Sequence, residues 1–167
     1  MVKYMLVRGD NQMANNLDQF IGFQLEEQEF GIGITDVDEI IPPEEITNLP
    51  GTEDFIEGMI NLRGEIIIIV DLRKRLGFEV SPLSETRIMV VDLERAKVGF
   101  IVDDASEVIK IDPEKITAPS GGVAGIKDEY LDGIARLEER LVILLDLDKL
   151  LSTTERAKIA EVGDQLE

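Results

Sequence analysis

The stretch FIEGMINLRGEIIIIVDLRKRL, residues Phe55–Leu76, decides how this chain folds. It holds a glycine, an Asn-Leu-Arg-Gly turn, a run of aliphatic residues and an aspartate that opens a basic segment. A second stretch, YLDGIARLEERLVILLDLDKLL over Tyr130–Leu151, aligns with it without a gap, so that Gly58 falls on Gly133. Glycines and aspartates match as well as apolar residues, which indicates an internal duplication.

A second match lies upstream of each copy. Phe30–Ile41 aligns with Val98–Ile109, also without a gap, and Gly31 falls on Gly99. The upstream and downstream matches differ slightly in their offset along the chain, and a longer loop in the second copy would absorb this difference. Chance similarity between aliphatic strands is the alternative, but the repeat predicts two similar small units packed as a pair.

Length and composition favour a small globular protein. A chain of 167 residues forms one domain, or two very small ones that share a core. Hydrophobic residues make up 44% of it and aromatic residues only 5%, so Ile, Leu and Val must build the core. No apolar run reaches the roughly 18 to 20 residues that a membrane span needs, and we expect no signal peptide. The lack of cysteine excludes a disulfide framework and fits a cytoplasmic protein.

The charge and the missing residue types exclude several functions. A net charge of −18 argues against binding to nucleic acid or to anionic membranes and favours partners with basic surfaces. The only dense basic run is Arg73-Lys74-Arg75. Without histidine or cysteine there is no imidazole base, thiolate nucleophile or Cys/His zinc site. We expect no cofactor and no metal.

Many short apolar segments separated by turn signals predict an all-β fold with closed barrels. Ile66–Val70 is apolar on both faces, so its strand should be buried on both sides. Gly31 and Gly33 suggest a bulge or a sharp bend, and Val37, Ile40 and Ile41 share a face of a short turn or strand. Strands are expected at Gln19–Leu25, Glu29–Ile34, Gly58–Leu62, Glu65–Leu72, Tyr130–Leu137 and Leu141–Leu147. Thr86–Leu93 and Lys97–Val102 should form a hairpin that Val108–Ile111 continues.

The expected organisation is a mobile tail over residues 1–17, with a short strand at Tyr4–Val7, a domain over residues 18–152 and a C-terminal segment over residues 153–167. The first barrel would span about residues 18–80 and the second about 81–152. Ser152 and Glu155 form a capping box, which predicts a short exposed helix to about residue 164.

Aspartates and glycines supply the candidates for chemistry. Asp71 and Asp146 occupy equivalent places and could act as acid and base or bind a hard cation. Capping of the following helical turns explains both of them better. Asp103-Asp104 reads as a solvated turn. The glycines of the loop over residues 118–125 lack the Gly-Lys-Ser/Thr ending of a phosphate loop.

Arg63 is a candidate for binding. It lies in a turn between two expected strands of a strongly acidic protein. A solvated arginine is one interpretation, and an arginine at a protein interface is the other, because interface hot spots are enriched in arginine. The second copy has Glu138 at the same place, which favours a functional role over an architectural one.

The sequence from Gly58 through Asn61-Leu62-Arg63-Gly64 to Val70-Asp71-Leu72-Arg73 resembles the signature of the CheW family of chemotaxis coupling proteins. The resemblance covers about residues 18–152. It implies two intertwined, five-stranded Src-homology-3-like barrels around a shared hydrophobic core, which agrees with the duplication. It also implies a non-catalytic adaptor that couples methyl-accepting chemoreceptors to the histidine kinase CheA, in the cytoplasm at membrane-associated receptor arrays.

By the same resemblance, the receptor-binding residues are Val37, Glu39, Gly58 and Arg63. A groove for a receptor helix needs an apolar floor, such as Val37 and Ile41, and a charged rim. The resemblance does not locate the residues that contact the regulatory domain of CheA.

Two positions depart from the family pattern. Ile68 stands where many relatives have proline, which restores a backbone donor and should make strand pairing more regular. Glu57 stands where some relatives have lysine, which changes the charge that a receptor would meet. Two other functions stay open on the residues alone: a small-ligand-binding β-barrel, and a carboxylate enzyme or metal-binding protein that uses Asp71 and Asp146.

Overall fold

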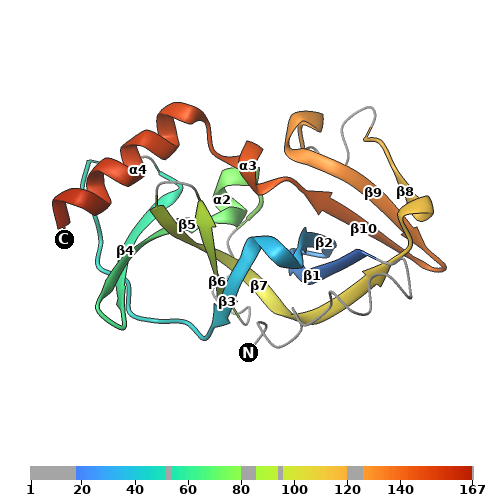
Figure 1. The fold of residues 1–167 in the computed structure, drawn as a ribbon, viewed down its shortest axis with the longest axis horizontal. Helices are drawn as coiled ribbons and strands as arrows, with labels where there is room; N and C mark the ends of the chain where they lie inside the picture. Colours follow the sequence, from blue (N-terminus) through green and yellow to red (C-terminus); the bar gives the residue numbers. More distant parts are fainter. Residues whose placement is uncertain (1–17, 52–53, 80–85, 94–95, 120–125, 167) are drawn as a thin grey trace.

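Strands dominate the computed structural model, which describes residues 18–51, 54–79, 86–93, 96–119 and 126–166 (Figure 1). The strands are β1 Asp18–Leu25, β2 Gln28–Gly33, β3 Val37–Ile41, β4 Ile56–Leu62, β5 Glu65–Asp71, β6 Thr86–Leu93, β7 Ala96–Ile111, β8 Ile116–Thr117, β9 Leu131–Leu137 and β10 Arg140–Leu145. The helices are α2 Leu72–Leu76, α3 Leu147–Leu150 and α4 Thr153–Leu166, with 3-10 turns η2 Ile34–Asp36, η3 Pro113–Lys115 and η4 Asp128–Tyr130. The predicted all-β class is confirmed. The predicted strand Tyr4–Val7 and most of the glycine-rich loop lie outside the described residues.

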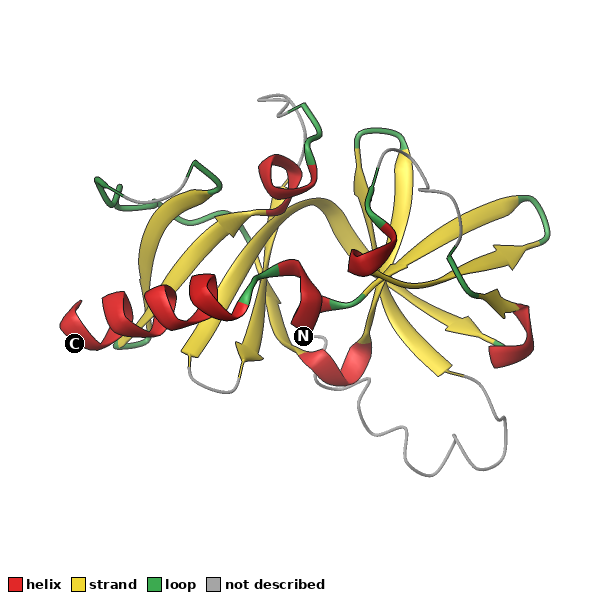
Figure 2. Ribbon diagram, turned by 90° about the horizontal axis from the view of Figure 1, so that it is seen from above, coloured by secondary structure: helices red, strands yellow, loops and turns green. Residues whose placement is uncertain are grey.

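Figure 2 shows two groups of strands, with β7 running from one group to the other. One group contains β1 and β2, the C-terminal part of β7, and β8, β9 and β10. The other contains β3, β4 and β5 with β6 and the N-terminal part of β7. Each barrel therefore combines strands from both copies of the repeat, and the barrels are intertwined as predicted. The boundary predicted near residue 80 therefore separates the two copies of the repeat, but it does not separate the two groups of paired strands.

The pairing that links the two copies has the same register in both barrels. Strand β5 runs parallel to β7 with Ile68 opposite Val98, and β10 runs parallel to β2 with Ile143 opposite Phe30. In the repeat, Ile68 is equivalent to Ile143 and Val98 is equivalent to Phe30, so the two parallel pairs join equivalent residues. The duplication is thus visible in the strand pairing as well as in the sequence.

Strand β5 lies between two apolar clusters. Ile68 and Val70 belong to the main core, and Ile67 and Ile69 belong to a second cluster within the barrel built on β3–β5. All four side chains are at most 2% exposed. Because successive strand residues point to opposite faces, the continuous aliphatic run supplies both clusters, which confirms the predicted two-sided burial. Ile68 pairs regularly with Met59 of β4.

Val108–Ile111 continues the predicted hairpin, because β7 runs without a turn from Ala96 to Ile111. One detail of the strand prediction, the bulge suggested by two glycines, was wrong. Gly31 and Gly33 mark no bulge, since the register of β1 with β2 is unbroken, and the shift falls between Gly22 and Gln24 opposite β7. Close packing explains Gly31 instead, because a Cβ atom there would lie 3.0 Å from Leu144 Cδ2.

The helix caps agree with the sequence. Asp71 accepts a hydrogen bond from the Arg73 amide at 3.0 Å, and Asp146 accepts one from the Asp148 amide at 3.0 Å. Gly77 ends α2 in the left-handed region with φ 84°. These caps fix the short helical turn that follows each parallel strand.

The predicted capping box at the start of α4 is present, but the helix is not exposed along its length. The Ser152 amide donates to Glu155 Oε1 at 2.7 Å, and the Glu155 amide donates to Ser152 Oγ at 3.1 Å. Ile159 and Ala160 are 1% and 4% exposed, where α4 packs against β5 and β7. The apolar residues of α4 lie at helical spacing and therefore cover the barrel.

Candidate functional site

The turn between β4 and β5 presents Arg63 to solvent. Arg63 adopts φ 53° and Gly64 φ 88°, so two consecutive residues occupy the left-handed region that a tight hairpin turn requires. Asn61 Oδ1 accepts a hydrogen bond from the Gly64 amide at 2.9 Å. The Asn-Leu-Arg-Gly signature thereby builds the turn, and the arginine lies at its tip.

Glu39 of β3 holds the guanidinium of Arg63. Nη2 of Arg63 donates to Oε2 of Glu39, and the arginine side chain is 66% exposed while the glutamate side chain is 9% exposed. Strands β3 and β4 share no ladder in the part of the chain that the structure describes. The ion pair therefore links β3 to the turn that follows β4, two segments that no backbone ladder connects. The buried carboxylate of Glu39 holds the exposed guanidinium of Arg63 in place.

Val37 and Gly58, the other two predicted receptor-binding residues, lie inside the fold. Val37 is 1% exposed and belongs to the main core. Gly58 adopts φ 149°, and a Cβ atom there would lie 2.0 Å from the Thr47 carbonyl oxygen. Thr47 and Met59 exchange two backbone hydrogen bonds of 2.9 Å beside it. The structure brings Glu39 and Arg63 together, whereas Val37 and Gly58 shape the strands that carry them.

Two apolar residues that were not among the predicted site residues lie near Gly58 and Arg63: Ile46, whose Cγ2 would be 2.8 Å from a Cβ on Gly58, and Leu62, which directly precedes Arg63. Ile46 and Leu62 are partly buried and pack against the second apolar cluster. Ile41, the expected floor residue, is 6% exposed and belongs to that cluster. Leu62 precedes Arg63 within the signature, so the sequence pattern could have indicated this residue. Ile46 lies in a loop outside the signature, and no sequence pattern pointed to it.

Glu57 is paired within the chain. Its carboxylate lies 2.6 Å from Lys74 Nζ of α2. The hydrogen bond that Lys74 donates to Glu57 raises the pKa of Lys74 above its usual value. The charge that departs from the family pattern is therefore shared with a neighbouring lysine.

Asp71 is neutralised by a buried arginine. Nε and Nη2 of Arg73 donate to the two carboxylate oxygens of Asp71, both at 3.0 Å, and Nη1 donates to Asp103 at 3.2 Å. Burial alone would lower the pKa of Arg73, but the hydrogen bond and charge of Asp71 outweigh it and raise that pKa. Asp103 is 8% exposed, so the predicted solvated turn was wrong. Burial raises its pKa even beside Arg73.

In the described part of the chain, each repeated aspartate has a cationic neighbour and caps a helical turn. Asp71 is tied to Arg73, while Asp146 caps α3 and lies 3.7 Å from Lys149 Nζ. Among the residues that the structure describes, no group of three or more acidic side chains is placed to hold a metal ion. Both aspartates have a structural explanation.

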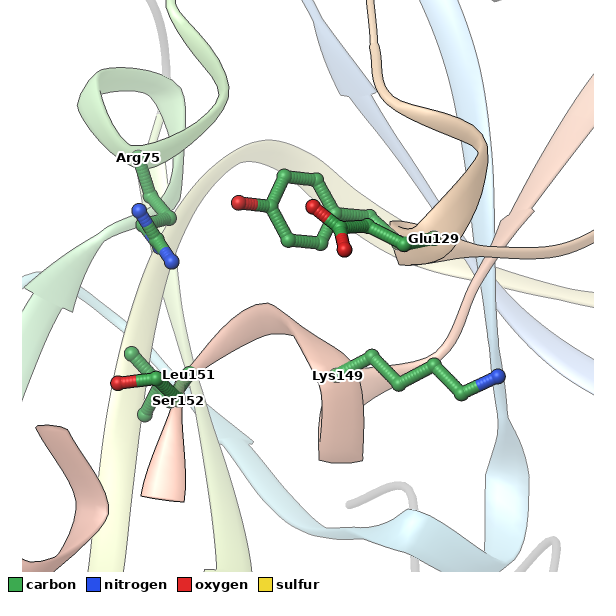
Figure 3. Close-up of a pocket in the computed structure, with 6 residues that line it drawn as sticks. Arg75, Glu129, Lys149, Leu151 and Ser152 are labelled. Carbon is green, nitrogen blue, oxygen red and sulfur yellow. The ribbon is translucent and has the colours of Figure 1, made fainter. Parts of the chain in front are cut away.

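A pocket of about 480 Å³ lies at the junction of the two halves (Figure 3). The guanidinium of Arg75 lies 5.0 Å from the ring centre of Phe55 and 5.4 Å from that of Tyr130, and these two aromatic residues are equivalent in the repeat. Arg75 also donates to Leu150 O at 2.7 Å and to Glu155 Oε1 at 3.2 Å. Its cation is thus bound by the chain itself. The pocket is lined by Arg75, Glu129, Tyr130, Lys149, Leu151 and Ser152.

Comparisons with known proteins agree with this architecture. A family model described as a CheW-like domain matches residues 19–155. The chemotaxis protein CheW of Klebsiella aerogenes is 37% identical over 146 residues, which cover 87% of this chain and 88% of that protein. CheW of Treponema pallidum is 34% identical over 157 residues, which cover 90% and 92%. The crystal structure of the scaffolding protein TtCheW from Thermoanaerobacter tengcongensis matches with a TM-score of 0.75 and 37% identity, over 83% of this chain and 90% of that one.

The fold and the anchored arginine define an intertwined double β-barrel protein with an exposed cationic hairpin tip. The chain belongs to the CheW family of chemotaxis proteins. In the described part of the chain, no helix is long and apolar enough to cross a bilayer.

Proposed function

We propose that the protein is a non-catalytic adaptor that couples methyl-accepting chemoreceptors to the histidine kinase CheA in the cytoplasm. Its family membership supports this role, and the similar TtCheW is itself called a scaffolding protein. The chain also lacks histidine and cysteine, the side chains that most often supply bases and nucleophiles. It would bind the cytoplasmic tip of the receptor and the regulatory domain of the kinase.

The ion pair of Arg63 with Glu39 carries the receptor part of the proposal. An exposed arginine normally loses side-chain freedom when it binds a partner, at a cost of about 0.5 to 1.5 kcal/mol. Glu39 already restricts Arg63, so much of that cost is met before binding. Leu62, which directly precedes Arg63 and is partly buried, offers apolar contact beside the cation. This combination suits an amphipathic receptor helix with an acidic residue beside its apolar face.

Val37 and Gly58 act indirectly in this proposal. Val37 anchors β3 in the core, and β3 carries Glu39. Gly58 lets the segment at Thr47 approach β4, which leads into the turn that holds Arg63. Substitutions at these two positions would therefore weaken receptor binding by displacing Glu39 and Arg63.

A titration against a soluble receptor-tip fragment tests this assignment. Arg63→Ala should weaken binding by about tenfold, the effect of losing a hot-spot arginine. Glu138→Ala is the matched control, because Glu138 holds the equivalent turn position in the second half, also with positive φ (29°). Equal affinities for Arg63→Ala and the unaltered protein, with both folded by circular dichroism, would exclude Arg63 from the receptor site.

The kinase contact is tested separately by titrating the regulatory domain of CheA. We propose that exposed barrel edges from both halves take part, so Arg63→Ala should leave this affinity unchanged. A protein that binds neither the receptor fragment nor the kinase domain, at low and at physiological salt, would contradict the adaptor function. A small-ligand-binding barrel would then be the better proposal.

A further inference from the structure

Each barrel contains one parallel strand pair that joins the two halves of the chain. Strand β5 pairs with β7 and β10 pairs with β2, in equivalent registers. An opposite assignment is conceivable, in which β5 pairs with β2 and β10 with β7. Each barrel would then be built from one half of the chain. Something in the sequence must favour the exchanged assignment over this simpler one.

Apolar packing at these pairs discriminates poorly between the two assignments. A Cβ atom on Gly99 would lie 2.7 Å from Ile69 Cδ1, and one on Gly31 would lie 3.0 Å from Leu144 Cδ2. Each glycine therefore makes room for an aliphatic side chain of the strand beside it. Ile69 and Leu144 are equivalent in the repeat, as are the two glycines. Either assignment would place an aliphatic side chain against a glycine.

The charges at the same strand pairs differ between the copies. Lys97 Nζ lies 3.4 Å from Glu65 Oε1 across β7 and β5. Arg140 donates through Nε to Glu29 Oε1 at 3.3 Å and through Nη2 to Glu29 Oε2, across β10 and β2. Glu65 and Arg140 are equivalent in the downstream match of the repeat, and Glu29 and Lys97 directly precede its upstream match at equivalent places. The two ion pairs occupy equivalent places with opposite polarity.

We infer that these two ion pairs of reversed polarity specify the exchange of strands between the barrels. In the opposite assignment, Glu65 would face Glu29 and Arg140 would face Lys97. Asp38 lies 3.4 Å from Lys97 Nζ and would then join a cluster of three carboxylates. Like charges on adjacent strands destabilise their pairing. All four side chains are partly exposed, so each ion pair adds little stability. In the opposite assignment, however, both attractive pairs are replaced by repulsive ones at the same time.

Introduced cysteines can report which strands pair, because the chain contains none. The register of Val142 with Glu29, carried back by one residue, places Leu141 beside Gln28. A Gln28→Cys/Leu141→Cys variant therefore reports the exchanged assignment. An Ala96→Cys/Leu141→Cys variant reports the opposite one, because Ala96 is the repeat equivalent of Gln28. Each variant is oxidised during refolding from denaturant, and the intramolecular disulfide is quantified by mass spectrometry.

Charge substitutions are then added to both reporters. Glu29→Lys with Lys97→Glu makes both existing pairs repulsive and both opposite pairs attractive. We expect the ratio of the disulfide at 28–141 to that at 96–141 to fall by roughly tenfold, and the melting temperature to fall below that of the neutral control Glu29→Gln/Lys97→Gln. Adding Glu65→Lys and Arg140→Glu restores opposite charges at both strand pairs and should restore the disulfide ratio. The melting temperature should rise above that of the two-site swap but stay below that of the unaltered protein, because the new carboxylates at positions 140 and 97 lie beside Glu107 and Asp38.

Failure of the two-site swap to refold, followed by recovery in the four-site variant, would also support the inference. The contrary result is equally clear. If the two-site swap has the disulfide ratio and melting temperature of the neutral control, the charges do not specify the exchange.

Discussion

Nε of Arg75 donates a hydrogen bond of 2.7 Å to the carbonyl oxygen of Leu150, and this bond ties α2 of the first half to α3 of the second. The two residues are equivalent in the repeat. The pair therefore lies where the halves meet, and only one half supplies the cation.

Arg75→Ala should destabilise the protein by about 1 to 3 kcal/mol, because it removes hydrogen bonds from a charged donor and two cation–π contacts. Guanidinium denaturation followed by circular dichroism measures the change. Lys115→Ala, an exposed substitution in η3, is the control and should stay within about 0.5 kcal/mol of the unaltered protein. A loss no larger than the control's would show that Arg75 does not hold the halves together.

Arg73→Leu should cost about 3 to 5 kcal/mol, because it leaves Asp71 and Asp103 buried without their cation. Arg73→Leu combined with Asp71→Asn and Asp103→Asn should recover part of this loss, since amides are cheaper to bury than carboxylates. Urea denaturation of the single and triple variants measures the recovery. A triple variant less stable than Arg73→Leu would contradict the electrostatic explanation.

The carboxyl of Asp36 should make the stability of the folded protein depend on pH. Asp36 is exposed as a residue, but partial desolvation of its carboxyl, followed by the charges of Asp148, Asp146 and Asp132, raises its pKa above the usual value. The folded protein therefore holds this proton more tightly than the unfolded chain, so this carboxyl favours folding increasingly as the pH falls through its raised pKa. Asp36→Asn should be more stable than the unaltered protein near neutral pH.

The stabilisation by Asp36→Asn should shrink as the pH falls through the carboxyl range, because the natural side chain then becomes neutral as well. Melting temperatures of both proteins at a series of pH values measure it. Asp92→Asn, at an exposed position on β6, is the control. A stability difference that is independent of pH would contradict the linkage.

Gly58→Ala should be strongly destabilising, by more than about 2 kcal/mol, because φ is 149° and the Thr47 carbonyl oxygen would lie 2.0 Å from the new Cβ. Gly133→Ala is the matched control at the equivalent place. There φ is not in the left-handed region, and the nearest backbone atom, Thr117 O, is 3.0 Å away. Calorimetric melting of the two variants compares them. Equal losses would show that the close approach at Thr47 is not decisive.

Local patterns in the sequence predicted much of this fold. The Asn-Leu-Arg-Gly turn, the two aspartate caps and the capping box at Ser152 depend on residues a few positions apart, and the structure has all of them. The two-sided burial of β5 followed from an unbroken aliphatic run. Such features are readable because their partners are near in sequence.

Features that depend on distant partners were harder to predict. Asp103 looks solvated in sequence, and only Arg73, 30 positions away, explains its burial. Helix α4 has few apolar residues, and its burial depends on β5 and β7. At the candidate site, the sequence selected Glu39 and Arg63 separately. The ion pair between them, across 24 positions, emerged only from the fold.

The long strand β7 affects the order in which the parts of this protein can fold during translation. Domains of larger proteins usually fold one after another as they are synthesised, the N-terminal one first. Here β3, β4 and β5 cannot complete their barrel before β6 and β7 have been translated, and β1 and β2 must wait for β10. The nascent first half therefore leaves the exit tunnel with unpaired strand edges. The barrel of β3, β4 and β5 can close once β7 has emerged, whereas the barrel of β1 and β2 closes only after β10, near the end of translation.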